Sequence, residues 1–156
     1  MQEKAAIRIS SDYAIASIPD TTRFIDALND GSIDAFAPRL SPDVTVISED
    51  TRNVIASRAD AVSYFNARLD GLNRSDPDSY LAVTGLYDAG DGVRHPCAIL
   101  YDRFRKSCVL RLGVNRERLV EQILLSAVAG TLDRARPVEP PAFPLTPILP
   151  TLAVGG

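Results

Sequence analysis

Apolar residues at helical spacing open the folded part of the chain. Phe24, Ile25 and Leu28 recur at the spacing that places them on one face of a helix. Asp20 is placed to cap this helix, because its carboxylate accepts backbone N–H groups. Gly31 ends the helix, since glycine adopts the left-handed backbone found after helix C-termini. The pattern therefore predicts a helix over about residues 20–30.

Two further helices follow in the same pattern. The second is indicated by apolar residues at i, i+3, i+4 and i+7, namely Ile33, Phe36, Ala37 and Leu40. Pro38 lies inside it, and an interior proline costs about 3 kcal/mol, so this helix should be short or kinked. The third and longest helix begins near Ser57 and Asp60, which resemble a capping box. Its apolar positions are Ala61, Val62, Phe65, Leu69 and Leu72.

Strand patterns separate these helices and then dominate the chain. The segment "DVTVIS" alternates β-branched residues, and a short strand fits within residues 49–57. Four strand-like runs follow, at residues 80–88, 95–104, 107–114 and 118–128. Helices first and a meander of strands afterwards predict an α+β fold, with a curved antiparallel sheet covered on one face. A length of 156 residues favours one domain.

Composition excludes several classes of function. A net charge of -3 gives no basic footprint for nucleic acid. No apolar run approaches the roughly 18–20 residues of a membrane span, and the N-terminus lacks a secretory pattern, so we expect a cytoplasmic protein without membrane contact. Cys97 and Cys108 fall in strand-like runs and are expected to be buried, reduced thiols. One histidine and no Cys-x-x-Cys motif predict no zinc site.

The pattern divides the chain into an arm (residues 1–19), a domain (residues 20–130) and a proline-rich C-terminal tail (residues 131–156). Prolines exclude helix and central strand from most of the tail. Three roles stay open for it. It is disordered, or it lies across its own domain or a partner subunit, or it presents a PxxP ligand. Its apolar residues favour packing over a solvated linker. They are Phe143, Leu145, Ile148, Leu149 and Leu152.

The order of these segments resembles a known superfamily. The stretches "TTRFIDALNDGSIDAFAPRLSPDVTVIS", "SRADAVSYFNARL" and "RERLVEQILL" together resemble the nuclear transport factor 2-like superfamily, also called SnoaL-like or ketosteroid-isomerase-like. The resemblance covers roughly residues 20–128. It implies a cone, a cystatin-like α+β barrel in which the curved sheet wraps around three helices and leaves a pocket. It also implies a homodimer through the outer sheet face. Enzymes and non-enzymes share this fold, so the resemblance leaves open whether the protein is catalytic.

The catalytic groups of the family are largely missing. The isomerases it resembles use a carboxylate base, a tyrosine and a protonated acid, and these positions fall on Ser48, Phe24 and Leu110. Glu49 could replace the base if the strand were shifted by one residue. The dehydratases of the fold use two histidines, whereas this chain has only His95. The epoxide hydrolases use an Asp–Arg–Asp set, for which no convincing equivalent is present. The weak catalytic candidates are therefore Ser48, Glu49 and His95.

Strand parity adds a pocket prediction. If residues 107–114 and 118–125 pair about Arg116, Leu110 faces Gln122 on the pocket side, and Arg111 faces Glu121 on the outer side. The predicted pocket residues come from the helices and these strands. They are Phe24, Leu28, Phe36, Ser48, Tyr64, Tyr101, Leu110 and Gln122.

Three functions are consistent with this sequence. The first is a domain that binds a small, largely apolar molecule in a central pocket, without cofactor or metal. The second is an enzyme of the polyketide cyclase, isomerase or hydrolase type, with Ser48, Glu49, His95, Tyr101 and Gln122 as its best groups. The third is a non-catalytic dimerisation or interaction module. An enzyme should show at least two convergent polar groups, one with a perturbed pKa, in a closed cavity.

Overall fold

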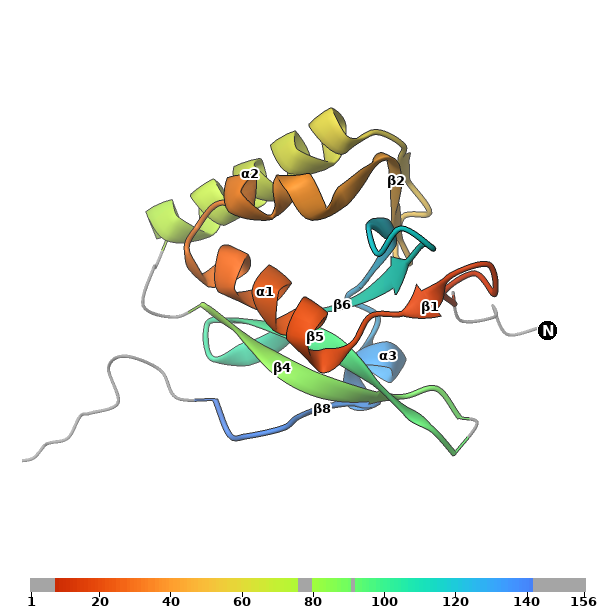
Figure 1. Ribbon diagram of the computed structural model, residues 1–156. Coiled ribbons are helices and arrows are strands. Elements are labelled where there is room, and N and C mark those ends of the chain that lie inside the picture. Colours follow the sequence, from red (N-terminus) through yellow and green to blue (C-terminus); the bar gives the residue numbers. More distant parts are fainter. Residues whose placement is uncertain (1–7, 76–79, 91, 142–156) are drawn as a thin grey trace, which may run out of the picture.

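The computed structural model describes residues 8–75, 80–90 and 92–141, and it shows a mixed α+β fold (Figure 1). The helices are α1 (Ile18–Asn29), the 3₁₀ helix η1 (Asp34–Arg39), α2 (Arg58–Ser75) and the short α3 (Ala129–Asp133). The strands are β1 (Ala14–Ile15), β2 (Leu40–Ser48), β3 (Val54–Ile55), β4 (Leu81–Asp88), β5 (Arg94–Asp102), β6 (Arg105–Val114), β7 (Val120–Ser126) and β8 (Ala135–Pro137). The three helices of the N-terminal half, the short strand β3 and the four later strands are therefore confirmed.

Helix α1 begins earlier than the sequence pattern predicts. Ser17 is its N-cap, and the Ser17 hydroxyl accepts a hydrogen bond from the backbone N–H of Asp20 (3.2 Å). Pro19 lies in the first turn, where a proline is favoured because no N–H is needed there. Asp20 is thus a first-turn acid and not the cap. The predicted end is confirmed, since Gly31 follows the helix with φ +86°.

The next two helices have the predicted character. Pro38 lies inside η1, which is a short 3₁₀ segment and not a regular α-helix. Helix α2 starts after Ser57, whose hydroxyl accepts a hydrogen bond from the N–H of Asp60 (3.2 Å). As predicted, Pro38 therefore lies in a short second helix, and Ser57 caps the start of the third.

The sheet is large, curved and unclosed (Figure 1). Its strand order is β3-β2-β7-β6-β5-β4-β8, and β1 pairs with the end of β6. Most pairs are antiparallel, as predicted, but β2 runs parallel to β7. This parallel pair arises because the chain reaches β7 only after α2 and the β4–β6 meander, without a hairpin between the two strands. The predicted all-antiparallel sheet is wrong at this one pair.

The predicted register of β6 and β7 is also wrong. Arg111 lies opposite Leu124 and not opposite Glu121, and Gln122 lies opposite Gly113 and not opposite Leu110. The connecting turn is organised by Asn115. Its side-chain oxygen accepts hydrogen bonds from the N–H groups of Glu117 and Leu119 (2.9 and 3.1 Å). A register shift follows between Gly113 and Val114. Because side chains alternate along a strand, the slip moves Gln122 to the face opposite Leu110.

Three phenylalanines fill the centre of the helix-covered face. Phe24 of α1 meets Phe36 of η1 and Phe65 of α2 in edge-to-face contacts, with ring centroids 5.1 and 5.7 Å apart. All three rings are buried. Leu28 and Leu110 belong to the same core. The hollow expected inside the cone is therefore closed at its centre by the protein's own side chains.

The opposite face of the sheet has its own smaller core. Tyr87, Cys97, Ile99, Tyr101 and Val109 pack there with residues of α3 and β8. The Lys106 ammonium donates hydrogen bonds to the carbonyls of Leu132 and Ala135 (3.0 and 2.9 Å), which fixes the end of α3 on this face. Residues 129–137 thus cover part of the surface through which the resemblance implies a homodimer. The tail residues from Phe143 onward lie outside the described part of the chain.

The two cysteines are buried, as predicted, and they are free thiols on opposite faces of the sheet. Cys97 belongs to the outer core and Cys108 to the helix-covered core. No helix in the described ranges is long and apolar enough to cross a membrane.

Candidate functional site

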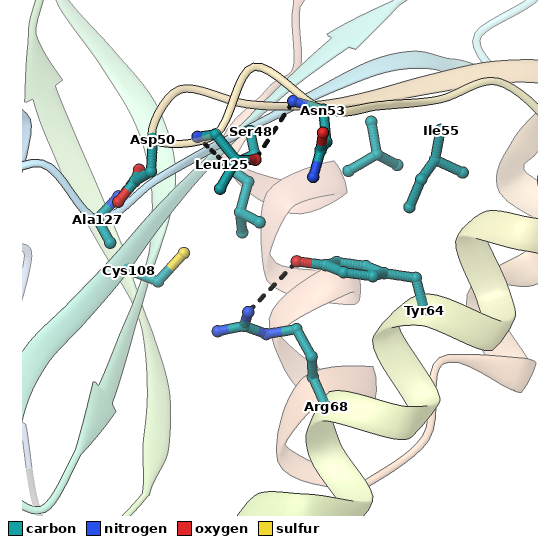
Figure 2. Close-up of a pocket in the computed structure, with 11 residues that line it drawn as sticks. Ser48, Asp50, Asn53, Ile55, Tyr64, Arg68, Cys108, Leu125 and Ala127 are labelled. Atoms are coloured by element: carbon teal, nitrogen blue, oxygen red, sulfur yellow. Dashed lines mark hydrogen bonds between the residues drawn. The ribbon is translucent and has the colours of Figure 1, made fainter.

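A cavity of about 270 Å³ lies at one end of the helix-covered face. Its walls come from β2, the β2–β3 turn, β3, helix α2 and the ends of β6 and β7 (Figure 2). It is displaced from the three central phenylalanines toward the turn that follows β2. Ligand pockets in proteins typically measure about 300–1,000 Å³, so this cavity suits a small ligand.

One wall of the cavity is apolar. Val46 of β2, Ile55 of β3 and Leu125 of β7 line it together with the Cys108 side chain of β6. Val46 and Ser48 point to the same side because they are two residues apart on β2. Leu125 comes beside them because β2 and β7 run in parallel, with Ser48 next to Leu125. The parallel pair is therefore the feature that brings this wall together.

Helix α2 supplies the polar wall opposite. Tyr64 and Arg68 are four residues apart and share one face of the helix. Arg68 Nη1 donates a hydrogen bond to the Tyr64 hydroxyl (3.3 Å), and Arg68 Cζ lies 5.8 Å from the Tyr64 ring centroid. Figure 2 shows the hydroxyl and the guanidinium side by side at the cavity. Arg68 forms no ion pair with any residue in the described ranges. The positively charged Arg68 side chain is thus positioned at the cavity by a hydrogen bond to the neutral Tyr64 hydroxyl.

The β2–β3 turn provides the remaining polar groups. The Ser48 hydroxyl accepts a hydrogen bond from the N–H of Thr51 (3.4 Å), and the Asp50 carboxylate accepts one from the N–H of Ala127 (2.9 Å). Asn53 also lines the cavity. Ser48 and Asp50 therefore accept hydrogen bonds that organise the turn and attach it to the end of β7.

The Cys108 thiol in the apolar wall is unreactive at neutral pH. Burial raises the pKa of Cys108 to about 12, with the Arg68 charge opposing this shift and the Asp50 charge adding to it. The group is protonated at neutral pH, and a thiol is a poor nucleophile in that form. Cys108 therefore contributes apolar surface to the cavity.

Two of the predicted pocket residues, Ser48 and Tyr64, line this cavity. Four others lie in the core beside or behind it, where they are nearly inaccessible to water: Phe24, Leu28, Phe36 and Leu110. Tyr101 lies in the outer core. The Gln122 side-chain oxygen accepts a hydrogen bond from the N–H of Ser10 (2.8 Å), in the N-terminal arm. The structure thus places the cavity nearer the end of the cone than the sequence predicts.

The three weak catalytic candidates do not come together. Ser48 lines the cavity, whereas Glu49 is buried beneath α3 and accepts a hydrogen bond from the Thr131 hydroxyl (2.8 Å). His95 of β5 lies opposite Tyr87 of β4 and lines a different cavity. Among the described residues, no group of three His, Cys, Asp or Glu side chains could hold a metal ion. The cavity beside α2 offers hydrogen-bonding groups, the Arg68 cation and the Asp50 carboxylate.

Sequence reasoning missed the β2–β3 turn and Arg68 as parts of the site. Arg68 carried a usable signal, because its position four residues after Tyr64 places both on one helix face. Asp50, Thr51 and Asn53 carried none, since residues in a turn have no periodicity that shows where they point.

Comparison with solved structures identifies the fold. The chain is similar to a domain of unknown function with a cystatin-like fold from Nostoc punctiforme, with 13% identity, a TM-score of 0.52, and coverage of 71% of this chain and 74% of the other. It is also similar to a putative ketosteroid isomerase from Kribbella flavida (17% identity, TM-score 0.44, 87% and 90% covered). A third similar structure is the epoxide hydrolase/cyclase-like enzyme SalBIII (16% identity, TM-score 0.44, 72% and 91% covered).

The likeness to the Nostoc punctiforme domain shows the fold alone, because 13% identity is compatible with unrelated functions. No protein-family model matches the chain, and no curated protein matches it. The cystatin-like α+β fold predicted from the sequence is confirmed.

Proposed function

We propose that this protein binds a small, largely apolar molecule that carries one polar or anionic group, in the cavity between α2 and β2, β3, β6 and β7. The observation that carries the proposal is the division of this cavity into two walls. Val46, Ile55 and Leu125 form an apolar wall, and Tyr64 and Arg68 form a polar one.

The apolar wall supplies most of the affinity in this proposal. Removing apolar surface from water contributes about 25 cal/mol per Å², and the wall is already formed by strand residues. A ligand body seated there needs no rearrangement of the sheet. The preformed wall therefore favours binding without a large ordering cost.

The polar wall orients the ligand. The Arg68 guanidinium has unused donors beyond its bond to Tyr64, because guanidinium carries five N–H groups. Hydrogen bonds to charged groups contribute about 1.5–3 kcal/mol each. A carboxylate or another hydrogen-bond acceptor on the ligand is accordingly expected to face Arg68 and Tyr64.

Binding fits the site better than proton-transfer chemistry. Cys108 is the group of the cavity with a resolved pKa shift, and that shift keeps it protonated. The carboxylate that lines the cavity, Asp50, accepts a backbone hydrogen bond from Ala127. The expectation of a homodimer, which the resemblance implies, and that of a cytoplasmic location, which came from the sequence, accompany this proposal without adding to its support.

The proposal is tested by screening a library of small aromatic and aliphatic carboxylates, each with its neutral amide, by two-dimensional NMR of the labelled full chain. We expect saturable shifts at Val46, Ile55 and Leu125, and weaker binding of the amides. Ile55→Trp should block binding by filling the half-buried rim of the cavity. Val93→Trp makes the same kind of change at a site 52% exposed and should leave binding unchanged.

Arg68→Gln should weaken the carboxylates about tenfold while changing the amides little, because only the charged partner is lost. Equal affinity of wild type and Ile55→Trp for every compound would refute the assignment of the cavity.

A further inference from the structure

A cation and a carboxylate line the mouth of the cavity beside α2. Arg68 comes from helix α2, and Asp50 comes from the β2–β3 turn. Both are exposed residues, whereas Val46, Cys108 and Leu125 of the inner wall are only 2–7% exposed. The cavity is therefore apolar inside and charged at its mouth, so a ligand would enter with its apolar body first.

The two charged groups act on the same point of the cavity wall, the Cys108 thiol. Burial raises the pKa of Cys108, the Arg68 charge opposes that shift, and the Asp50 charge adds to it. Figure 2 shows the thiol between the Asp50 carboxylate and the Arg68 guanidinium. Polar groups of a ligand that lies over the thiol are therefore close to both charges.

Each charged group keeps hydrogen-bonding capacity for a ligand. Among the described residues Arg68 bonds only to Tyr64, and a guanidinium carries five N–H donors. Asp50 Oδ1 accepts a hydrogen bond from the N–H of Ala127 (2.9 Å), and Asp50 Oδ2 has no hydrogen-bond partner within the described ranges. Arg68 therefore offers donors alone, and Asp50 offers an acceptor alone.

The other polar groups of the cavity discriminate less between ligands. Asn53 lines the mouth, and its side-chain amide can donate or accept. The Ser48 hydroxyl, which can also do both, already accepts a hydrogen bond from the N–H of Thr51 (3.4 Å). Arg68 and Asp50 thus decide which groups the polar end of a ligand must carry.

We propose that the ligand of this cavity is an organic acid that carries a hydrogen-bond donor, a hydroxyl or an ammonium group, near its carboxylate. The carboxylate faces Arg68 and Tyr64, the donor faces Asp50, and the apolar body lies on Val46 and Leu125. A simple carboxylate would leave Asp50 without a partner and would bring two negative charges near each other, which disfavours binding. The proposal rests on the function proposed above and narrows it from one polar group to a pair of unlike groups.

The test compares three aryl acids by NMR titration of the labelled full chain at neutral pH. They are phenylacetate, mandelate, which adds a hydroxyl beside the carboxylate, and 2-phenylglycine, which adds an ammonium group there. We expect at least one of the two substituted acids to bind about three- to tenfold more tightly than phenylacetate, because it makes one more hydrogen bond to a carboxylate. Its two enantiomers should differ in affinity, since only one can place the donor at Asp50 while the ring stays on the apolar wall. A gain for mandelate alone identifies the donor as a hydroxyl, and a gain for 2-phenylglycine alone identifies it as an ammonium group.

Matched variants test the two residues. Asp50→Asn keeps an oxygen for the N–H of Ala127 and replaces the free carboxylate oxygen with an amide donor. The advantage over phenylacetate should vanish in this variant, whereas phenylacetate itself should bind at least as well as to wild type. Asp43→Asn removes the same charge from an exposed residue of β2 outside the cavity and should keep the advantage. Arg68→Gln should weaken all three acids about tenfold.

The outcomes separate this inference from the function on which it rests. Saturable binding of phenylacetate that depends on Arg68, with no advantage for either substituted acid, would overturn the inference and leave the proposed function standing. An advantage that is equal in Asp50→Asn and Asp43→Asn would overturn it as well. If none of the three acids gave saturable shifts at Val46, Ile55 and Leu125, both the inference and the proposed function would be contradicted.

Discussion

The central phenylalanine cluster yields the most quantitative prediction, through the substitution Phe24→Ala. Phe24 is 0% exposed and touches the rings of Phe36 and Phe65. Truncation removes a whole ring from a site where α1, η1 and α2 meet. The surrounding helices are held by their own caps and sheet contacts, so the space should collapse only partly.

The expected loss of stability follows from these contacts. Burial of a phenylalanine ring and the cavity left by its removal together cost about 3–5 kcal/mol. Each edge-to-face aromatic contact contributes about 0.5–1.5 kcal/mol, and two of them are lost, which places the expected cost toward the upper end. In a domain of this size each kcal/mol lowers Tm by about 2–4 °C, so we expect Tm to fall by roughly 6–20 °C.

Urea unfolding followed by circular dichroism measures this loss, with calorimetry for Tm. Val54→Ala is the control, because Val54 is 58% exposed and its truncation should cost less than about 0.5 kcal/mol. Phe24→Leu should fall between the two, since it keeps most of the apolar volume. A Phe24→Ala loss below about 1 kcal/mol would show that the cone has an open centre, contrary to the packing described.

Two further predictions concern buried thiols and close backbone contacts. Burial raises the pKa of both Cys97 and Cys108 from 9.0 to about 12. The free energy of unfolding should therefore keep its full value below about pH 9. It should fall as the pH rises from 9 toward 12, because in that range only the unfolded chain loses the thiol protons. The decline should reach about 1.4 kcal/mol per pH unit for each thiol. In pH-dependent urea unfolding it should be steeper in wild type than in a variant with both cysteines replaced by alanine, which keeps only the decline due to Tyr80 and Tyr101, whose pKa values burial also raises. An equal decline in both proteins would contradict the assignment. Gly85→Ala should cost about 1–3 kcal/mol, because its new Cβ would lie 2.5 Å from a side-chain carbon of Ile99. Gly71→Ala, with nothing within 4 Å of its Cβ on α2, should instead gain about 0.5–1 kcal/mol, and a scan in which both glycines behave alike would refute the contrast.

The sequence was informative wherever one residue dictates local geometry. Pro38 predicted the short second helix, Ser57 the start of α2, and Gly31 the end of α1. Periodicity located all four long strands of the meander because their apolar runs are long. The predicted first cap, Asp20, is wrong, because Ser17 caps the helix and Pro19 lies in its first turn, where a proline is favoured.

The pairing register of β6 and β7 could not be predicted from the sequence, and the wrong register led to a wrong prediction of the pocket residues. The β6–β7 turn depends on Asn115, on the left-handed backbone of Arg118 (φ 68°) and on a register shift, none of which alternation reveals. The predicted register put Gln122 on the same face as Leu110, whereas Gln122 lies on the opposite face of the sheet. The position of the cavity depended on how completely the three phenylalanines fill the centre, and that is a matter of volume and not of pattern.

The most direct test of the proposed ligand site is a set of intermolecular NOEs from the tightest-binding library compound to labelled methyl groups of the protein. The proposal predicts NOEs from the apolar part of the compound to Val46, Ile55 and Leu125. NOEs confined to Ile9, Ile15 and Ala89 on the other face, or to exposed methyl groups such as those of Val128, would contradict it.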